Sequence, residues 1–463
     1  MEMQRSGTDA VSVLISAVGE RAGTLSGNTV GDSAGNPAGK KPEGAGMVNA
    51  GNHRAPADAV VNQVILKIVQ RCNLDCTYCY VYNRGDDSWK TRPPVISERV
   101  LLRLAERINE HCRRHQLSSF TVELHGGEPL LIGKRKMQAL LTLLRSRVDA
   151  AHLRFTMQTN GLLLDSDWID LLARNQVSFG ISLDGPPALA DQQRILRKDR
   201  SGSTQPLLDI IAQLRSEGPL FDQLFGGCLC VVNPQCDGGE LVDWFVAQGF
   251  DAFDFLLPDG NRLNPPQGWT GVAPYRRFLL SAFERWHLLG ARAPRIRKFE
   301  LMMSGLLGGK VFLDALGGDL RLLCVLESDG SIGVSDVTRI CGGEYANDVL
   351  NIFDHALDEH VRRYRIDEVQ QVCATCRACP HLASCGGGYL PHRFNGIHFA
   401  NPSIYCEALY ALSERMTQLL REQLPAQLLA GMATVASALV PLPSPSTLSI
   451  SPQPAVLLSG VVP

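Results

Sequence analysis

The chain has 463 residues, a formal net charge of −2, 20% charged residues and 45% hydrophobic residues. This length predicts two domains, and the hydrophobic fraction is ordinary for a globular protein. The near-neutral charge excludes a polycationic surface, so we expect neither a nucleic-acid partner nor an anionic membrane surface. Fourteen cysteines are more than usual, and Met1–Gly19 lacks the basic start and apolar core of a secretory signal. We therefore expect a cytoplasmic protein whose thiols serve as metal or redox ligands.

Residues 1–57 are rich in Gly, Ala, Ser and Asn, which predicts a disordered extension. Strands and helices then alternate over residues 58–270. The predicted strands are Val61–Val69, Phe120–Leu124, Leu153–Gln158, Val177–Leu183, Cys228–Val232 and Phe253–Leu257. The predicted helices are Glu98–His115, Lys134–Ala150, Asp165–Arg174, Leu207–Ser216 and Gly239–Gln248. This order is typical of an α/β fold, and predicts a parallel barrel or partial (β/α)6 barrel.

Three cysteines, Cys72, Cys76 and Cys79, directly follow the first predicted strand. Chemistry in such barrels lies where strands end and loops begin. Three thiolates are one short of the four that a 4Fe–4S cluster takes, which leaves one iron open for a small-molecule ligand. The alternatives are three unrelated structural thiols or a zinc site, although zinc usually takes four ligands and no fourth lies nearby in the sequence.

The other predicted strands also end in glycines or polar residues, which let a backbone approach a ligand or donate hydrogen bonds to it. These segments are His125–Pro129, Gln158–Gly161, Ser182–Pro186, Asn233–Pro234 and Pro258–Gly260. Taken singly, each is also compatible with an ordinary turn.

Together, the C-x3-C-x2-C motif, with Tyr78 before its last cysteine, and Gly126-Gly127-Glu128-Pro129 resemble the radical S-adenosylmethionine (radical SAM) barrel of peptide-modifying enzymes. The resemblance implies that the three cysteines hold a 4Fe–4S cluster, which binds SAM and generates a 5′-deoxyadenosyl radical. It also implies a SAM-binding set, with Gly126, Gly127 and Glu128 at the amino group, Asn160, Ser182 and Asp184 at the ribose or carboxylate, and Tyr78 near the adenine.

Residues 271–412 contain a second group of cysteines. Ala273–Gly309 has a helical pattern, and Cys324–Ile332 has the pattern of a hairpin around Asp329-Gly330. Five cysteines then fall within 34 residues: Cys373, Cys376, Cys379, Cys385 and Cys406. A zinc ribbon is one interpretation, because C-x2-C pairs suit tetrahedral metals of either kind.

Beside a radical SAM barrel, this pattern resembles a SPASM domain, a cysteine-rich extension that carries auxiliary iron–sulfur clusters. The resemblance implies an auxiliary 4Fe–4S cluster on Cys376, Cys379, Cys385 and Cys406. The chain departs from the full pattern, because Ser335 and Tyr389 stand where further cysteines are expected. Cys324, Cys341 and Cys373 therefore either rebuild an altered second cluster or are bystanders.

The tracts Cys385–Phe394 and Phe399–Cys406 are similar to FxsB-type peptide maturases. That branch implies a ribosomally made precursor peptide as partner and a carbon–carbon bond from an aromatic ring to a β-carbon, giving a three-residue cyclophane. An external electron donor such as flavodoxin or ferredoxin is also implied. Asp254, Asp259 and His392 are candidates for the proton acceptor by position alone.

Three alternatives remain at this point: a sulfatase maturase that makes formylglycine, a thioether-forming maturase, and a non-catalytic zinc-binding adaptor. Residues 413–463 are interpreted as a helix end followed by a low-complexity tail. The apolar stretch Leu428–Leu442 within them is shorter than the roughly 20 residues of a membrane-spanning helix.

Overall fold

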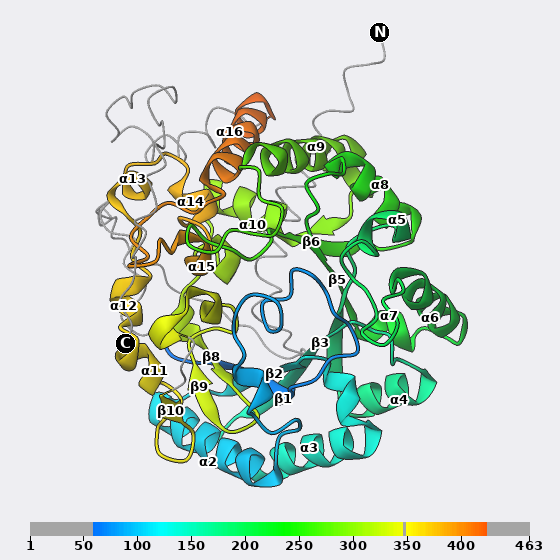
Figure 1. The fold of residues 1–463 in the computed structure, drawn as a ribbon, viewed down its shortest axis with the longest axis vertical. Helices are drawn as coiled ribbons and strands as arrows, with labels where there is room; N and C mark the ends of the chain where they lie inside the picture. Colours follow the sequence, from blue (N-terminus) through cyan, green and yellow to red (C-terminus); the bar gives the residue numbers. More distant parts are fainter. Residues whose placement is uncertain (1–58, 346–348, 424–463) are drawn as a thin grey trace, which may run out of the picture.

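The computed structural model describes residues 59–345 and 349–423 (Figure 1). The predicted N-terminal extension and the apolar stretch Leu428–Leu442 lie outside these residues. Within the described residues, no helix is both long enough and apolar enough to cross a membrane.

The fold is built on a ten-stranded sheet in the order β10-β9-β8-β1-β2-β3-β4-β5-β6-β7. The strands are β1 (Gln63–Val69), β2 (Ser119–Gly126), β3 (His152–Thr159), β4 (Val177–Ser182), β5 (Phe225–Val231), β6 (Ala252–Leu256), β7 (Arg295–Ile296), β8 (Leu323–Leu326), β9 (Ser331–Gly333) and β10 (Leu350–Asn351). Neighbours pair in parallel from β8 through β1 to β7, whereas the β8–β9 and β9–β10 pairs are antiparallel. The six predicted strands are confirmed, and their order is that of a partial barrel.

Helices surround the curved sheet (Figure 1). The longer ones are α2 (Glu98–His115), α3 (Lys134–Arg147), α4 (Ser166–Arg174), α6 (Thr204–Ser216), α8 (Gly238–Ala247), α9 (Ala273–Leu289), α10 (Arg297–Leu306) and α16 (Cys406–Gln423). The short ones are α5 (Pro187–Ala190), α7 (Leu220–Leu224), α11 (Glu359–Arg363), α12 (Ile366–Val369), α13 (Ala374–Arg377), α14 (Leu382–Cys385) and α15 (Leu390–Arg393). Several helices have an N-cap side chain that accepts a hydrogen bond from a backbone amide of the first turn. Ser97 accepts one from the Val100 amide in α2, and Asp165 accepts one from the Trp168 amide in α4.

The helical prediction over Ala273–Gly309 is wrong in its middle. The stretch is divided into α9 and α10 by β7, which pairs with β6. Gly290 ends α9 with a φ of 55°, a conformation that favours glycine. Pro294 follows and cannot donate a helical hydrogen bond, so the chain leaves the helix and re-enters the sheet.

The inner face of the barrel carries polar and charged side chains among apolar ones. Along β2, Val122 and Leu124 are fully buried on the helix side, while Glu123 and His125 alternate with them and line the interior. Parallel strands covered on both faces usually have near-continuous apolar sequences. The alternation along β2 therefore indicates that the barrel encloses a cavity with polar groups in its wall instead of a fully packed apolar core.

The C-terminal half completes the wall of this cavity. The predicted hairpin is confirmed as β8 and β9, and β8 lies parallel to β1, with Leu326 opposite Leu66. Segments that follow β7 therefore line the same cavity as the barrel strands. Asp314, Asp336 and Tyr389 are among them.

The loop after β2 lies against the backbone of the three-cysteine loop. The Gly127 amide donates to the Val69 carbonyl at 2.8 Å, and the Glu128 amide donates to the Arg71 carbonyl at 2.9 Å. A Cβ added at Gly127 would lie 2.3 Å from the Arg71 oxygen, a contact that no ordinary side chain makes. Gly127 thus allows the loops after β1 and β2 to pack together.

We expect Gly127→Ala to lower the free energy of unfolding by about 1–3 kcal/mol, because the new methyl group must displace backbone atoms. Urea unfolding followed by circular dichroism measures the change. Gly226→Ala is the matched control, since its Cβ would meet only the Phe179 carbonyl oxygen, at 3.5 Å. Equal stability of the two variants would contradict this account of the loop packing.

Candidate functional site

The candidate site is a cavity of about 990 Å³ at the strand ends of the barrel. This volume lies at the upper end of the range of small-molecule sites, roughly 300–1,000 Å³. Its lining includes all three cysteines of the loop after β1. The cavity is therefore large enough to hold a cofactor with part of a second molecule beside it.

The three-cysteine loop is anchored by the segment that follows α5. The Asp75 amide donates to the Ile195 carbonyl at 2.9 Å, and the Thr77 amide donates to the Gln193 carbonyl at 3.1 Å. Burial raises the pKa of the Cys72 and Cys79 thiols, and raises that of Cys76 to about 11. The protein alone therefore favours neutral thiols, and a bound metal centre has to displace their protons.

The spacing of the sulfurs distinguishes the two kinds of metal centre. Zinc–sulfur bonds of about 2.3 Å in a tetrahedron hold thiolate sulfurs roughly 4 Å apart. Within residues 59–345 and 349–423, only His111, His115 and Asp358 form a group of three possible ligands whose atoms all lie within 4.8 Å of one another. No three cysteines in this part of the chain are gathered that tightly, so a single zinc ion on three thiolates would require the side chains to move closer together.

Glu128 connects the loops around the three-cysteine motif. Its buried carboxylate accepts hydrogen bonds from the Thr159 hydroxyl at 2.6 Å, the Asn160 amide at 2.8 Å and the Leu130 amide at 2.9 Å. The Asn160 side chain in turn donates to the Asn73 side-chain oxygen at 2.7 Å. The contacts of Glu128 thus tie the ends of β2 and β3 to the cysteine loop.

Tyr78, Asp184 and Arg194 form a buried polar group beside the same loop. The Tyr78 hydroxyl donates to Asp184 at 2.5 Å, and Arg194 donates to the Tyr78 oxygen at 2.7 Å. The Arg194 guanidinium lowers the pKa of Cys76, partly opposing the effect of burial. Ser182, the remaining predicted SAM contact, accepts a hydrogen bond from Gln158 at 3.0 Å and also lines the cavity.

Arg194 is a functional candidate that the sequence analysis missed. It is 6% exposed and lines the cavity, yet it lies in an irregular segment between α5 and α6. The sequence around it contains no motif, so only the folded chain reveals the positive charge next to the thiols.

The five cysteines of the second group lie near one another. The Cys376 thiol has a hydrogen bond with Cys373 and also interacts electrostatically with Cys385 and Cys406. Cys379 in turn raises the pKa of Cys406. The predicted ligands of the auxiliary cluster therefore face a common region, with Cys373 as an additional neighbour.

Glycines allow the chain to turn tightly inside this group. Gly386, Gly387 and Gly388 have φ values of 57°, 85° and 80°, which only glycine adopts at little cost. They directly follow Cys385 and reverse the chain beside Cys376. Two arginines, Arg262 and Arg393, place positive charge next to the thiols.

The structure does not bring Cys324, Cys341 and Cys373 together. Cys324 lies in β8, where its sulfur contacts the Gln63 carbonyl oxygen at 4.0 Å. Cys341 lies beside Asn261, and Cys373 lies beside Cys376. The geometry therefore gives no support to the proposal that these three thiols form a second auxiliary cluster.

The three predicted proton acceptors all line the cavity but have different surroundings. Asp254 is held in place by Arg297 at 2.9 Å and by the Lys298 amide at 2.9 Å. Asp259 lies 3.6 Å from His392 Nε2, a buried nitrogen without a hydrogen-bond partner in the described structure. Asp254 already accepts two hydrogen bonds, whereas His392 Nε2 is still free to exchange a proton with Asp259 or with a bound molecule.

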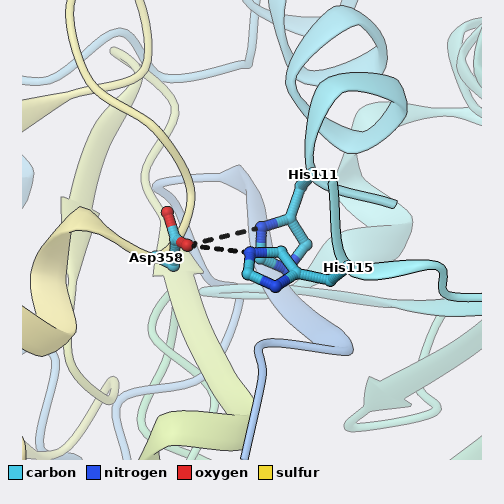
Figure 2. A group of neighbouring side chains, drawn as sticks. All are labelled: His111, His115 and Asp358. Carbon is cyan, nitrogen blue, oxygen red and sulfur yellow. Dashed lines mark hydrogen bonds and ion pairs between the residues drawn. The ribbon is translucent and has the colours of Figure 1, made fainter. Parts of the chain in front are cut away.

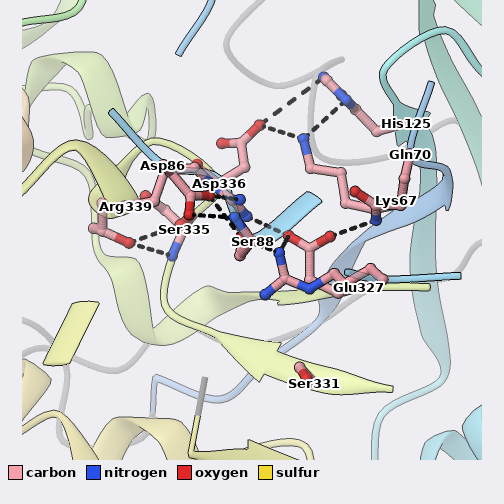
Figure 3. Close-up of polar contacts among 12 residues, drawn as sticks. Lys67, Gln70, Asp86, Ser88, His125, Glu327, Ser331, Ser335, Asp336 and Arg339 are labelled. Carbon is pink, nitrogen blue, oxygen red and sulfur yellow. Dashed lines mark hydrogen bonds and ion pairs between the residues drawn. The ribbon is translucent and has the colours of Figure 1, made fainter. Parts of the chain in front are cut away.

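A further group of charged side chains was missed by the sequence analysis. Lys67 in β1 contacts Asp336 at 3.0 Å and His125 at 3.1 Å, as Figure 3 shows. Tyr80 donates its hydroxyl hydrogen to the same Asp336 carboxylate. The charge of Lys67 holds the pKa of Asp336 well below its usual range, although burial acts in the opposite direction. The sequence did contain one sign of this group, because Lys67 interrupts the apolar run Val61–Val69 and a buried lysine needs an acidic partner.

Next to this group, Glu123 also lines the cavity, and burial raises its pKa to about 7. Gln63 donates a hydrogen bond to it at 2.7 Å. A second set of buried side chains, Gln70, Glu327, Arg339 and Asp86, forms hydrogen bonds beside the Lys67 group (Figure 3). Of these residues, Glu123, His125 and Asp336 line the cavity, so its wall carries ionisable groups beside β2.

Comparison with known families and relatives places these features in context. The model of the radical SAM superfamily matches residues 66–228. An uncharacterized protein of Synechocystis is 32% identical over 371 residues, which cover 74% of this chain and 88% of that protein. A cysteine-type anaerobic sulfatase-maturating enzyme of Clostridium perfringens is 26% identical over 332 residues, covering 68% of this chain and 85% of that enzyme.

Solved structures share the fold. The enzyme anSMEcpe, with bound AdoMet and the Cp18Cys peptide, has a TM-score of 0.65 at 21% identity and covers 78% of this chain and 99% of its own. Streptococcus suis SuiB, bound to its precursor peptide SuiA, has a TM-score of 0.50 at 15% identity, covering 75% of this chain and 76% of its own. At these identities the likeness concerns the fold alone.

We expect two cysteine variants to lose iron separately. Cys76→Ala and Cys385→Ala should each retain about four fewer iron atoms per chain than the wild type, because under the predicted assignment each removes a ligand of a different cluster. Iron and sulfide assays of anaerobically purified protein measure this. Cys236→Ala, whose thiol contacts the Asn233 carbonyl oxygen, is the control and should retain all of the iron. Normal iron content in Cys76→Ala would refute the assignment of the loop.

We expect Asp336→Asn to lower the free energy of unfolding by about 3–5 kcal/mol, because it leaves the Lys67 charge buried without its carboxylate. The Asp336 pKa is depressed in the folded state, so its contribution is present above the unfolded pKa of about 4 and is lost as the pH falls. Denaturant unfolding at several pH values measures both effects.

The control for this prediction is Asp222→Asn. Asp222 pairs with Arg215 at 3.0 Å on the surface, where such a pair contributes less than about 1 kcal/mol. A cost for Asp336→Asn no greater than that of this control would show that the Lys67 charge does not depend on Asp336.

Proposed function

The chain belongs to the radical SAM superfamily, and we propose that it oxidises a substrate peptide and joins two of its side chains by a carbon–carbon bond. The observation that carries the proposal is the cavity, which connects the three-cysteine loop with Asp259, which follows β6, and with Tyr389 and His392 of the C-terminal half. A peptide side chain beside SAM would lie between these two sets of residues.

Two groups of cysteines, one in the cavity wall and one outside its lining, fit the iron–sulfur clusters of the superfamily. Cys72, Cys76 and Cys79 would hold the SAM-binding 4Fe–4S cluster, and Cys376, Cys379, Cys385 and Cys406 an auxiliary one. When bound, these groups supply a 5′-deoxyadenosyl radical, which removes a hydrogen atom from a substrate carbon, and an acceptor for the electron that must leave afterwards. The protein binds, orients and protects from water, while the cofactors carry the difficult chemistry.

The chain's own residues position SAM in this proposal. Arg194 offers a buried positive charge to the carboxylate of SAM, next to the proposed contacts Asn160, Ser182 and Asp184. Its guanidinium is fixed by Tyr78 at 2.7 Å, so little side-chain freedom is lost when SAM binds. Glu128 acts through Thr159 and Asn160, whose positions it sets. The backbone of Gly126 and Gly127 would receive the amino group of SAM.

The proton that leaves the substrate needs an acceptor. In crosslinking, a carbon radical adds to an aromatic ring, and the ring then loses one proton and one electron to restore its aromaticity. Asp259 and His392 are proposed to accept this proton, because they face each other at 3.6 Å in the cavity wall. Asp254 is assigned to positioning, since Arg297 and the Lys298 amide occupy its carboxylate.

A second candidate function is the oxidation of a cysteine or serine β-carbon to formylglycine. It is favoured by the 26% identity with a sulfatase-maturating enzyme over 85% of that enzyme's length. Both reactions begin with hydrogen removal from a β-carbon. The crosslink is preferred because of the likeness of Cys385–Cys406 to crosslinking maturases and because Ser335 and Tyr389 replace expected cysteines. A precursor peptide and a flavodoxin- or ferredoxin-like donor are the proposed partners.

The test is anaerobic incubation of the cluster-loaded enzyme, SAM and a reductant with short peptides encoded beside its gene. We expect a product lighter by two hydrogen atoms per bond, with no fragmentation in tandem mass spectrometry between an aromatic residue and the residue two positions away. Cys76→Ala is the control and should leave the peptide unchanged. An aldehyde that reacts with a hydrazine reagent would support formylglycine formation and refute the crosslink.

A further inference from the structure

His111, His115 and Asp358 lie close together away from the cavity, as Figure 2 shows. The two histidines are one helical turn apart near the end of α2, and Asp358 directly precedes α11. We propose that these three side chains bind a zinc ion that joins α2 of the barrel to the segment leading into the second group of cysteines.

The distances suit a small tetrahedral ion. Asp358 Oδ2 lies 3.2 Å from His115 Nε2 and 3.9 Å from His111 Nδ1. Metal–ligand bonds of about 2.0–2.2 Å in a tetrahedron separate two ligand atoms by roughly 3.4 Å. The observed separations lie on either side of that value, so small side-chain rotations are enough to surround an ion.

The tautomer of His111 is fixed for metal binding. Its Nε2 lies 2.7 Å from the Val61 carbonyl oxygen, which can only accept, so Nε2 carries the hydrogen. Nδ1 therefore presents a lone pair, and it is buried without a hydrogen-bond partner in the described structure. His111 is 2% exposed, and Nδ1 points toward Asp358 (Figure 2). A backbone carbonyl that holds the other ring nitrogen is the usual support of a metal-binding histidine.

The remaining surroundings leave room for a fourth ligand. The side chains of His115 and Asp358 are 25% and 28% exposed, so an ion can enter from solvent and retain a water molecule. Arg114 lies 3.7 Å from Oδ1 of Asp358, the oxygen not assigned to the metal. His360 is occupied, because its two ring nitrogens contact the carbonyl oxygens of Leu357 and Leu323. Two imidazoles and one carboxylate suit zinc.

The ion would strengthen an existing contact between two parts of the chain. Arg103 and Arg107 on α2 donate hydrogen bonds to the carbonyl oxygens of Ile352 and Phe353. A zinc ion bound by His111 and His115, one turn further along α2, would connect this helix to Asp358 as well. The site is thus structural, and it is separate from both groups of cysteines.

The test uses the cluster-loaded full-length protein, so that the cysteines are occupied, dialysed against zinc sulfate and then against buffer. Inductively coupled plasma mass spectrometry counts the zinc retained. We expect about one zinc ion per chain in the wild type, and at least about tenfold weaker retention in His115→Ala and Asp358→Asn, which each lose a ligand. His152→Ala, an exposed histidine at the start of β3, is the matched control and should bind like the wild type.

Thermal unfolding gives a second readout that does not depend on activity. Zinc should raise the unfolding midpoint of the wild type and His152→Ala, but not of His115→Ala or Asp358→Asn, because an ion that binds only the folded state stabilises it. Equal zinc retention in the wild type and both ligand variants would overturn the proposal. Absence of retained zinc in the wild type would also overturn it, and would show that the three residues form only an ion pair.

Discussion

The pairing of Lys67 with Asp336 is the interaction on which the enclosed site depends. Lys67 has a side-chain exposure of 3%, and an isolated charge at such a depth is strongly unfavourable. Its carboxylate partner is contributed by the segment after β9, 269 positions away in the sequence. The positive charge that β1 places inside the barrel is therefore neutralised by a carboxylate from the C-terminal half.

This dependence explains why the C-terminal half is continuous with the barrel. β8 extends the parallel sheet next to β1, and the hairpin then carries Asp336 over the cavity. The same segment contributes Glu327, which accepts from Gln70 at the end of β1 at 2.7 Å. Two separate polar contacts thus fix the hairpin beside the three-cysteine loop. Movement of the hairpin would expose the cavity and leave buried charges unpaired.

The sequence predicted the strands and the polar segments at their ends because both depend on local patterns. Apolar runs indicate strands, and a parallel arrangement brings all their carboxyl ends to one edge. The Lys67–Asp336 pair could not be predicted, because it depends on which strand lies beside β1. Arg194 was missed for a related reason, since its irregular segment is positioned only by contacts with the cysteine loop. The break between α9 and α10 had a local signal in Gly290 and Pro294, which the helical periodicity on either side obscured.

Ser335 and Tyr389 change the chemistry of the cavity wall beside Asp336. Both are buried, and the Ser335 hydroxyl oxygen has no hydrogen-bond partner among the described residues. Oxygen atoms at these two positions make poor ligands for iron–sulfur clusters, which are held by thiolates. They can instead hydrogen-bond to a bound molecule or to each other. The thiols that remain gathered in the C-terminal half, around Cys376, are then the ones able to hold a redox centre there.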